Sequence, residues 1–144
     1  MKKILIGLLA FLSLGAFFGG LFLIIKPDGS FFDMPVEILQ NSPFTNFLIP
    51  GIILILCFGI LPIYNIYSII KRPDNHFFRK INLIYDYHFS WTLSVYIGIA
   101  LIIWINVQTL FFNSVEIIHT FYSFYGILIV CVSLLPKTRK LFKL

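Results

Sequence analysis

Residues 4–25 read ILIGLLAFLSLGAFFGGLFLII and contain no charged side chain. As an α-helix, this stretch is about 33 Å long at about 1.5 Å per residue, which is enough to cross the hydrocarbon core of a bilayer. Lys2 and Lys3 precede it, and Lys26 and Pro27 follow it. The run is longer than the roughly 7–15 apolar residues of a signal peptide, and no A-x-A-like cleavage site closes it. We therefore expect an uncleaved membrane helix.

Three more apolar runs follow, at residues 47–70, 89–112 and 117–135. The run over 47–70 contains Pro50 and Pro62, which membrane helices tolerate because neighbouring groups satisfy the freed carbonyls. The sequence thus predicts an all-α membrane protein whose four transmembrane helices form an antiparallel bundle. We expect residues 1–144 to make a single domain.

The composition excludes a water-soluble domain. Of the 144 residues, 59% are hydrophobic and 12% are charged, whereas about a quarter of an average soluble chain is charged. The formal charge of +5 does not indicate nucleic-acid binding, because the basic residues flank the apolar runs in short clusters. Membrane lipids are the expected partners of these side chains.

The placement of Lys and Arg predicts the orientation. Ten of the 11 basic residues fall on one side if four helices alternate: Lys2, Lys3, Lys71, Arg72, Arg79, Lys80, Lys137, Arg139, Lys140 and Lys143. Cytoplasmic loops carry the excess of positive charge in membrane proteins. We therefore expect both termini in the cytoplasm and the segment 26–46 on the outer side.

Two loops contain apolar residues at helical spacing. In the outer loop, residues 33–39 predict a short capped helix with one apolar side. In the inner loop, helical spacing relates Phe77, Phe78, Ile81, Ile84 and Tyr85. Both segments are expected to lie in the headgroup layer as interfacial helices.

Small residues in the first run predict close helix packing. Gly15, Ala16, Gly19 and Gly20 form two overlapping small-x-x-x-small patterns, which let helix backbones approach one another. A leucine at Gly19 or Gly20 is expected to destabilise the bundle. Asn65, Asn106 and Gln108 are uncharged polar residues within the runs, and helix association by interhelical hydrogen bonds is their expected role.

Recognisable catalytic or cofactor chemistry is missing from the sequence. No Asp, Glu, Lys, Arg or His lies in the middle of a run, whereas pumps and proton antiporters generally need such a group. Glu116 and His119 have the i, i+3 spacing of a bundle metal motif, but a di-metal site needs a second motif and two further acids. Cys57 and Cys131 are expected to be packing residues. We predict no cofactor and no metal.

The outer end of the bundle is the one place where the sequence suggests a site. Amides at the end of the third helix, an acid and an imidazole at the start of the fourth, and acids of the outer loop could converge there, because short connections place such groups near one another. The candidates are Asp28, Asp33, Glu37, Asn106, Gln108, Glu116 and His119. Asn106 and Gln108 point about 200° apart on a helix, so at most one of them faces the centre squarely.

Several stretches together resemble a family of small bacterial four-helix integral membrane proteins with no assigned activity. They are Pro27-Asp28-Gly29-Ser30, Met34-Pro35, Ser42-Pro43-Phe44, Phe47-Leu48-Ile49-Pro50-Gly51, His88-Phe89-Ser90-Trp91-Thr92-Leu93-Ser94 and Trp104-Ile105-Asn106-Val107-Gln108. The resemblance covers most of the chain. It implies the four-helix topology and a bacterial cytoplasmic membrane, but no cofactor or catalytic residue.

Three functions stay open at this point. The uncharged membrane interior and short loops favour a non-enzymatic membrane component that acts through helix, lipid or partner-protein contacts, as a homo-oligomer or in a larger membrane complex. A small oligomeric transporter or channel is the alternative, and it would need a continuous polar track. A membrane-embedded enzyme acting on lipid or quinone is the second alternative, although no nucleophile or metal set is recognisable.

Overall fold

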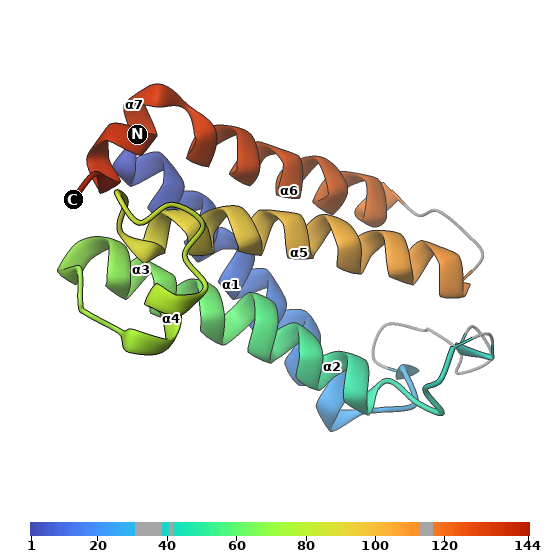
Figure 1. Ribbon diagram of the computed structural model, residues 1–144. Coiled ribbons are helices and arrows are strands. Elements are labelled where there is room, and N and C mark those ends of the chain that lie inside the picture. Colours follow the sequence, from blue (N-terminus) through green and yellow to red (C-terminus); the bar gives the residue numbers. More distant parts are fainter. Residues whose placement is uncertain (31–38, 41, 113–116) are drawn as a thin grey trace.

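The computed structural model of the chain describes residues 1–30, 39–40, 42–112 and 117–144 (Figure 1). Its helices are α1 (Lys2–Ile25), α2 (Leu48–Ile55), the π-helical turn η3 (Leu56–Ile60), α3 (Leu61–Lys71), α4 (His76–Lys80), α5 (Phe89–Phe112), α6 (Ile117–Leu134) and α7 (Pro136–Phe142). Within the described residues, four stretches are long and apolar enough to cross a membrane: Lys2–Ile25, Leu48–Lys71, Phe89–Leu110 and Ile117–Leu134. The predicted all-helical class with four candidate spans is confirmed, and the ranges agree with the predicted ones to within two residues.

The surface of these helices is apolar. In the most apolar window of each span, only 28% to 39% of the residues are buried inside the molecule. Large side chains such as Leu14, Phe18, Ile103 and Phe124 are more than half exposed. An apolar exterior of this extent is costly in water and favourable in a lipid environment. The packing therefore supports a membrane protein.

Two prolines are accommodated differently in the second span. Pro50 lies in the first turn of α2, where a missing N–H leaves no helical hydrogen bond unmade. Pro62 follows η3, in which the N–H of Leu61 donates to the carbonyl of Leu56, five residues back. A widened turn of this kind avoids the clash that a proline ring makes with the preceding turn. The buried hydroxyl of Ser13 on α1 donates to the carbonyl of Gly59 at 2.7 Å, which ties the widened turn to its neighbour.

Two pairs of glycines bring helices into backbone contact. A Cβ atom built on Gly20 of α1 would lie 2.9 Å from the carbonyl oxygen of Gly51 on α2, and 2.6 Å from Ile55 Cγ1. A Cβ on Gly126 of α6 would lie 2.9 Å from the carbonyl oxygen of Gly98 on α5. Such distances leave no room for a side chain. One pair therefore sets the approach of α1 to α2, and the other sets the approach of α5 to α6.

The other small residues predicted for packing on α1 have looser surroundings. Ala16 is buried, but a Cβ on Gly19 would meet only Leu54 Cδ2, at an ordinary contact distance of 3.5 Å. A Cβ on Gly15 would meet the hydroxyl of Tyr122 at 2.8 Å, and that hydroxyl is the tip of a side chain. Of the three glycines, Gly20 is the one whose Cβ would meet the backbone of another helix.

One of the membrane amides joins two spans. Asn65 is fully buried, and its Nδ2 donates to Ser94 Oγ at 2.8 Å, which links α3 to α5. The interhelical role predicted for Asn65 is confirmed. The same prediction is wrong for Asn106, which is exposed and donates to the carbonyl of Ile102 in its own helix at 2.8 Å. An amide at the helix surface can reach the carbonyl four residues back, and it then has no need of a neighbouring helix.

Both chain ends and the segment between α3 and α5 lie at one end of the long helices, on the left in Figure 1. We call this the basic end. Residues 140–144 run beside the loop there: the N–H of His88 donates to the carbonyl of Phe142 at 2.8 Å, and the N–H of Leu144 donates to that of Asp86, also at 2.8 Å. The guanidinium of Arg72 also donates to the carbonyl of Leu141. The C-terminal segment is thus built into the loop structure.

The predicted loop helices need correction. In the loop at the basic end, α4 covers only His76–Lys80, capped by the Asn75 side chain, whose oxygen accepts from the N–H groups of Phe77 and Phe78. The segment after Lys80 consists of turns, because the Asn82 side chain donates to the carbonyl of Tyr87 and holds the chain in a bend. Helix α7 was not predicted, although Pro136 suits its first turn. The helix predicted over 33–39 falls, apart from Leu39, outside the described residues.

Candidate functional site

Of the predicted outer cluster, the structure brings two of the described residues together. Gln108 and His119 line the same cavity, of about 290 Å³, between α1, α5 and α6. Asn106 is exposed and does not line this cavity, and it donates to the carbonyl of Ile102 in its own helix. Asp28 does not line this cavity either, and it lies in an exposed turn. Asp33, Glu37 and Glu116 lie outside the described residues.

Asp28 organises its own turn. Its Oδ1 accepts from the N–H of Ser30 at 3.0 Å, and Gly29 between them has a positive φ of 76° that L side chains rarely adopt. The hydrogen bonds from Ser30 lower the pKa of this carboxyl below its usual value. A local turn accounts for the pattern Pro27-Asp28-Gly29-Ser30.

We call the 290 Å³ cavity the lateral groove. Its wall on α1 is made by Gly15, Ala16 and Gly19, whose small side chains leave the space unfilled. Leu101 and Ile105 form its apolar floor on α5. The polar groups that line it are Trp104, Gln108, His119 and Tyr122. The small residues of α1 therefore have two roles, with Gly20 at a helix crossing and Gly15, Ala16 and Gly19 along a cavity.

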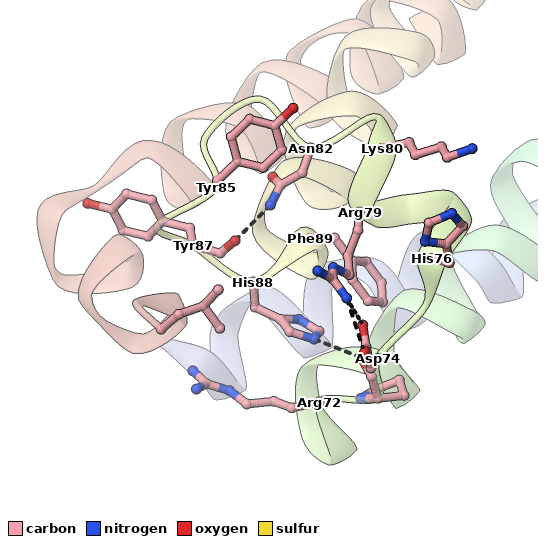
Figure 2. A pocket seen from close by; sticks show the side chains of 12 residues that line it. Arg72, Asp74, His76, Arg79, Lys80, Asn82, Tyr85, Tyr87, His88 and Phe89 are labelled. Carbon is pink, nitrogen blue, oxygen red and sulfur yellow. Dashed lines mark hydrogen bonds and ion pairs between the residues drawn. The ribbon is translucent and has the colours of Figure 1, made fainter.

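A larger cavity, of about 550 Å³, lies at the basic end (Figure 2). We call it the basic pocket. Three cationic side chains line it, those of Arg72, Arg79 and Lys80, together with one acidic side chain, that of Asp74. His76, Asn82, Tyr85, Tyr87 and His88 complete the polar wall. The groups suit an anion, because cations outnumber carboxylates and hydroxyl, amide and imidazole donors surround them.

Arg72 closes α3 in a left-handed conformation, with φ 50°. Its N–H donates to the carbonyl of Ser68, and this turn directs the guanidinium to the C-terminal segment at Leu141. A non-glycine residue in this region is uncommon and is held there by its surroundings. The strained turn thus places the Arg72 guanidinium, which lines the basic pocket, in contact with α7.

Arg79 forms an ion pair with Asp74, with Nη1 to Oδ1 at 3.1 Å (Figure 2). The two side chains are 63% and 75% exposed, so water screens the pair and it contributes little to stability. Such a pair can open at small cost. Arg79 is therefore able to turn to an incoming anion while staying at the mouth of the pocket.

His88 forms the inner wall and is almost fully buried. Its Nε2 lies 3.0 Å from the carbonyl oxygen of Pro73, which only accepts hydrogen bonds, so Nε2 carries the proton. Nδ1 lies 2.8 Å from Ser90 Oγ and accepts from the Ser90 N–H at 3.3 Å. Burial lowers the pKa of His88, and Arg72 nearby acts in the same direction, whereas the Pro73 bond and Asp74 oppose them. A neutral Nε2–H imidazole thus fastens α5 to the loop after α3.

Sequence reasoning did not find the basic pocket. The cluster of Lys71, Arg72, Arg79 and Lys80 indicates only the orientation when the sequence is taken alone. The missing element is α7, because the predicted fourth span ends at residue 135 and no helix is predicted after it. The pattern Pro-x-x-Arg-Lys after a span was the available signal, since proline also starts helices.

Metal and thiol sites find no support in the described part of the chain. No three His, Cys, Asp or Glu side chains lie close enough there to hold a metal ion. Cys57 and Cys131 are free and exposed on different helices. Comparisons of the chain with protein-family models, with curated proteins and with solved structures each found no match.

Proposed function

We propose that this protein is a non-enzymatic component of a bacterial cytoplasmic membrane that binds the phosphate group of anionic lipids in its basic pocket. Its four long helices form an antiparallel bundle across the bilayer, with both termini in the cytoplasm. The basic pocket carries the proposal: three cationic side chains and one acidic side chain line a hollow of about 550 Å³ beside the ends of apolar helices. Basic pockets on the cytoplasmic side of membrane proteins bind anionic headgroups in this manner.

The orientation is supported by the charges. The basic end carries ten of the 11 basic residues, and positive charge marks the cytoplasmic side. That side faces the leaflet whose anionic lipids attract Lys and Arg. A headgroup at this depth can reach the pocket while its chains stay along the exposed apolar side chains of the spans.

The orientation predicts the behaviour of two reporters fused after Leu144 through a flexible linker. Alkaline phosphatase, which is active only outside the cytoplasm, should be silent, and green fluorescent protein, which folds in the cytoplasm, should fluoresce. The same phosphatase fused after Asp28 in a truncated chain is the positive control. Phosphatase activity from the Leu144 fusion would contradict the orientation.

We expect the affinity for anionic lipid to fall when two exposed cationic side chains of the pocket are removed. We expect Arg79→Gln with Lys80→Gln to weaken binding of phosphatidylglycerol about 30-fold, because each basic residue near a headgroup contributes about 1 kcal/mol. Native mass spectrometry of the detergent-solubilised protein, titrated with phosphatidylglycerol and with phosphatidylcholine of the same chains, measures this. The wild type should prefer phosphatidylglycerol.

The matched control removes two charges outside the pocket. Lys137 and Lys140 lie on α7, are exposed and do not line the pocket. Lys137→Gln with Lys140→Gln has the same net charge as the pocket variant and should keep most of the affinity. Equal losses in the two variants would mean that net charge alone attracts the lipid, and the pocket proposal would be abandoned. Competition by free glycerol phosphate would show that the phosphate group is recognised without the chains.

A further inference from the structure

The cations of the basic pocket lie in two separate places. Arg79 and Lys80 are in the last turn of α4, whereas Arg72 follows α3 as its C-terminal cap. Figure 2 shows Arg72 and Lys80 on opposite sides of the pocket, with Arg79 and His88 between them. A ligand that contacts both sides must therefore carry negative charge at two points.

The two outermost cations have no acidic partner. The ion pair at the pocket joins Arg79 to Asp74, with Nη1 to Oδ1 at 3.1 Å. Arg72 and Lys80 are exposed, and neither forms an ion pair within the described part of the chain. Charge complementarity favours a ligand that approaches both of them. The unpaired positive charge of the pocket is thus divided between its two sides.

Arg72 is held on its own side of the pocket. Its backbone has the left-handed φ of 50°, and its guanidinium Nη2 donates to the carbonyl of Leu141. Moving this side chain to the α4 side would break that hydrogen bond. A guanidinium has five N–H donors, so the others stay available for a phosphate group. Arg72 is therefore positioned in advance to hold a second anionic group rather than to share the one at α4.

The hollow has room for more than one phosphate group. Its volume of about 550 Å³ lies within the range of about 300–1,000 Å³ of pockets that enclose whole small molecules. A single phosphate group at the α4 side leaves Arg72 and the space beside it unused. Volume and charge thus both favour a headgroup with a second phosphate.

We propose that the basic pocket selects lipids whose headgroup carries two phosphate groups, one held at α4 by Arg79 and Lys80 and the other by Arg72. This inference rests on the proposed function, because it requires that the pocket holds a lipid phosphate. Two kinds of lipid present this chemistry. In cardiolipin a glycerol joins the two phosphates, and in diacylglycerol diphosphate they are linked directly.

The first experiment compares lipids with one and with two phosphates. Phosphatidylglycerol, diacylglycerol diphosphate with the same two acyl chains, and cardiolipin are titrated against the detergent-solubilised full chain by native mass spectrometry. We expect at least one diphosphate lipid to bind about fivefold more tightly than phosphatidylglycerol, because one more basic residue contacts it. The tighter of the two shows how the phosphates are linked. Inorganic pyrophosphate that competes as strongly as the lipids would overturn the assignment to a lipid.

Substitutions at Arg72 locate the second phosphate. Arg72→Gln should lower the affinity for the preferred diphosphate lipid about fivefold more than the affinity for phosphatidylglycerol, so the preference disappears. Arg72→Lys keeps a cation at this position and should keep most of the preference. Lys137→Gln is the matched control, because it removes one exposed charge of α7 that does not line the pocket. It should bind with the full preference of the wild type.

The outcomes separate this inference from the proposed function. If the wild type bound all three lipids equally, or if Arg72→Gln kept the preference, selection for two phosphates would be wrong. The proposed function would still stand if Arg79→Gln with Lys80→Gln weakened the binding of phosphatidylglycerol. No effect of that double variant on any of the lipids would overturn both. If Arg72→Gln does not fold, as judged by thermal unfolding in detergent, the comparison of lipids on the wild type decides.

Discussion

Gly20→Ala is expected to lower the free energy of unfolding by about 1–3 kcal/mol, the usual cost of forcing atoms into a close-packed site. The new Cβ would lie 2.6 Å from Ile55 Cγ1 and 2.9 Å from the carbonyl oxygen of Gly51. The isoleucine side chain can turn aside, but the carbonyl belongs to the backbone of α2. The two helices must therefore separate, and the contacts along the crossing weaken with them.

The neighbouring position provides the matched control for this experiment. Gly19→Ala adds the same atom to the same helix, but that atom meets only Leu54 Cδ2 at 3.5 Å. Thermal unfolding in mild detergent should show a clearly lower melting temperature for Gly20→Ala and little change in melting temperature for Gly19→Ala. Gly126→Ala should behave like Gly20→Ala, because its Cβ would lie 2.9 Å from the carbonyl oxygen of Gly98. Equal melting temperatures for Gly19→Ala and Gly20→Ala would show that this crossing does not limit stability.

The spans could be predicted from the sequence because each depends on a local property. A run of about 20 apolar residues allows the backbone only one arrangement in lipid, because a helix satisfies its own hydrogen bonds there. Asn65 was predictable for a related reason, because a buried amide in a span needs a partner on another helix. The sequence does not predict that this partner is Ser94, because the pairing depends on how the two helices are rotated against each other.

The cavities could not be predicted because each is made by segments far apart in the chain. The lateral groove exists where small residues of α1 meet the end of α5 and the start of α6. Of the predicted outer cluster, the structure places Gln108 and His119 at this groove. Asn106 does not line it, because two steps of about 100° place Asn106 and Gln108 on different sides of the helix. The basic pocket depends on the C-terminal segment lying beside the loop after α3, an arrangement set by three backbone or guanidinium hydrogen bonds rather than by an apolar pattern.

The stability of the folded protein is expected to fall as the pH is lowered from 7.5 to 5, and His88 is expected to be responsible. Its pKa in the folded protein is lowered from the usual 6.5, chiefly by burial, with Arg72 acting in the same direction and Asp74 against it. The unfolded chain then binds more protons than the folded one below pH 6.5, so stability rises with pH across that window. The contribution is complete above about pH 6.5 and is lost as the pH falls through the lowered pKa.

His88→Gln should remove most of this pH dependence and also lower the melting temperature at pH 7.5. A glutamine can still donate to the carbonyl of Pro73, but it does not titrate and does not keep the acceptor that lies beside Ser90. His76→Gln is the control, because His76 is exposed and no hydrogen bond in the described residues fixes its ring. Melting temperatures of the three proteins in detergent at pH 7.5, 6.5, 5.5 and 5.0 provide the measurement. If His88→Gln lost stability with acid as steeply as the wild type, the proton would be taken up elsewhere, and the neutral imidazole would not be what joins α5 to the loop after α3.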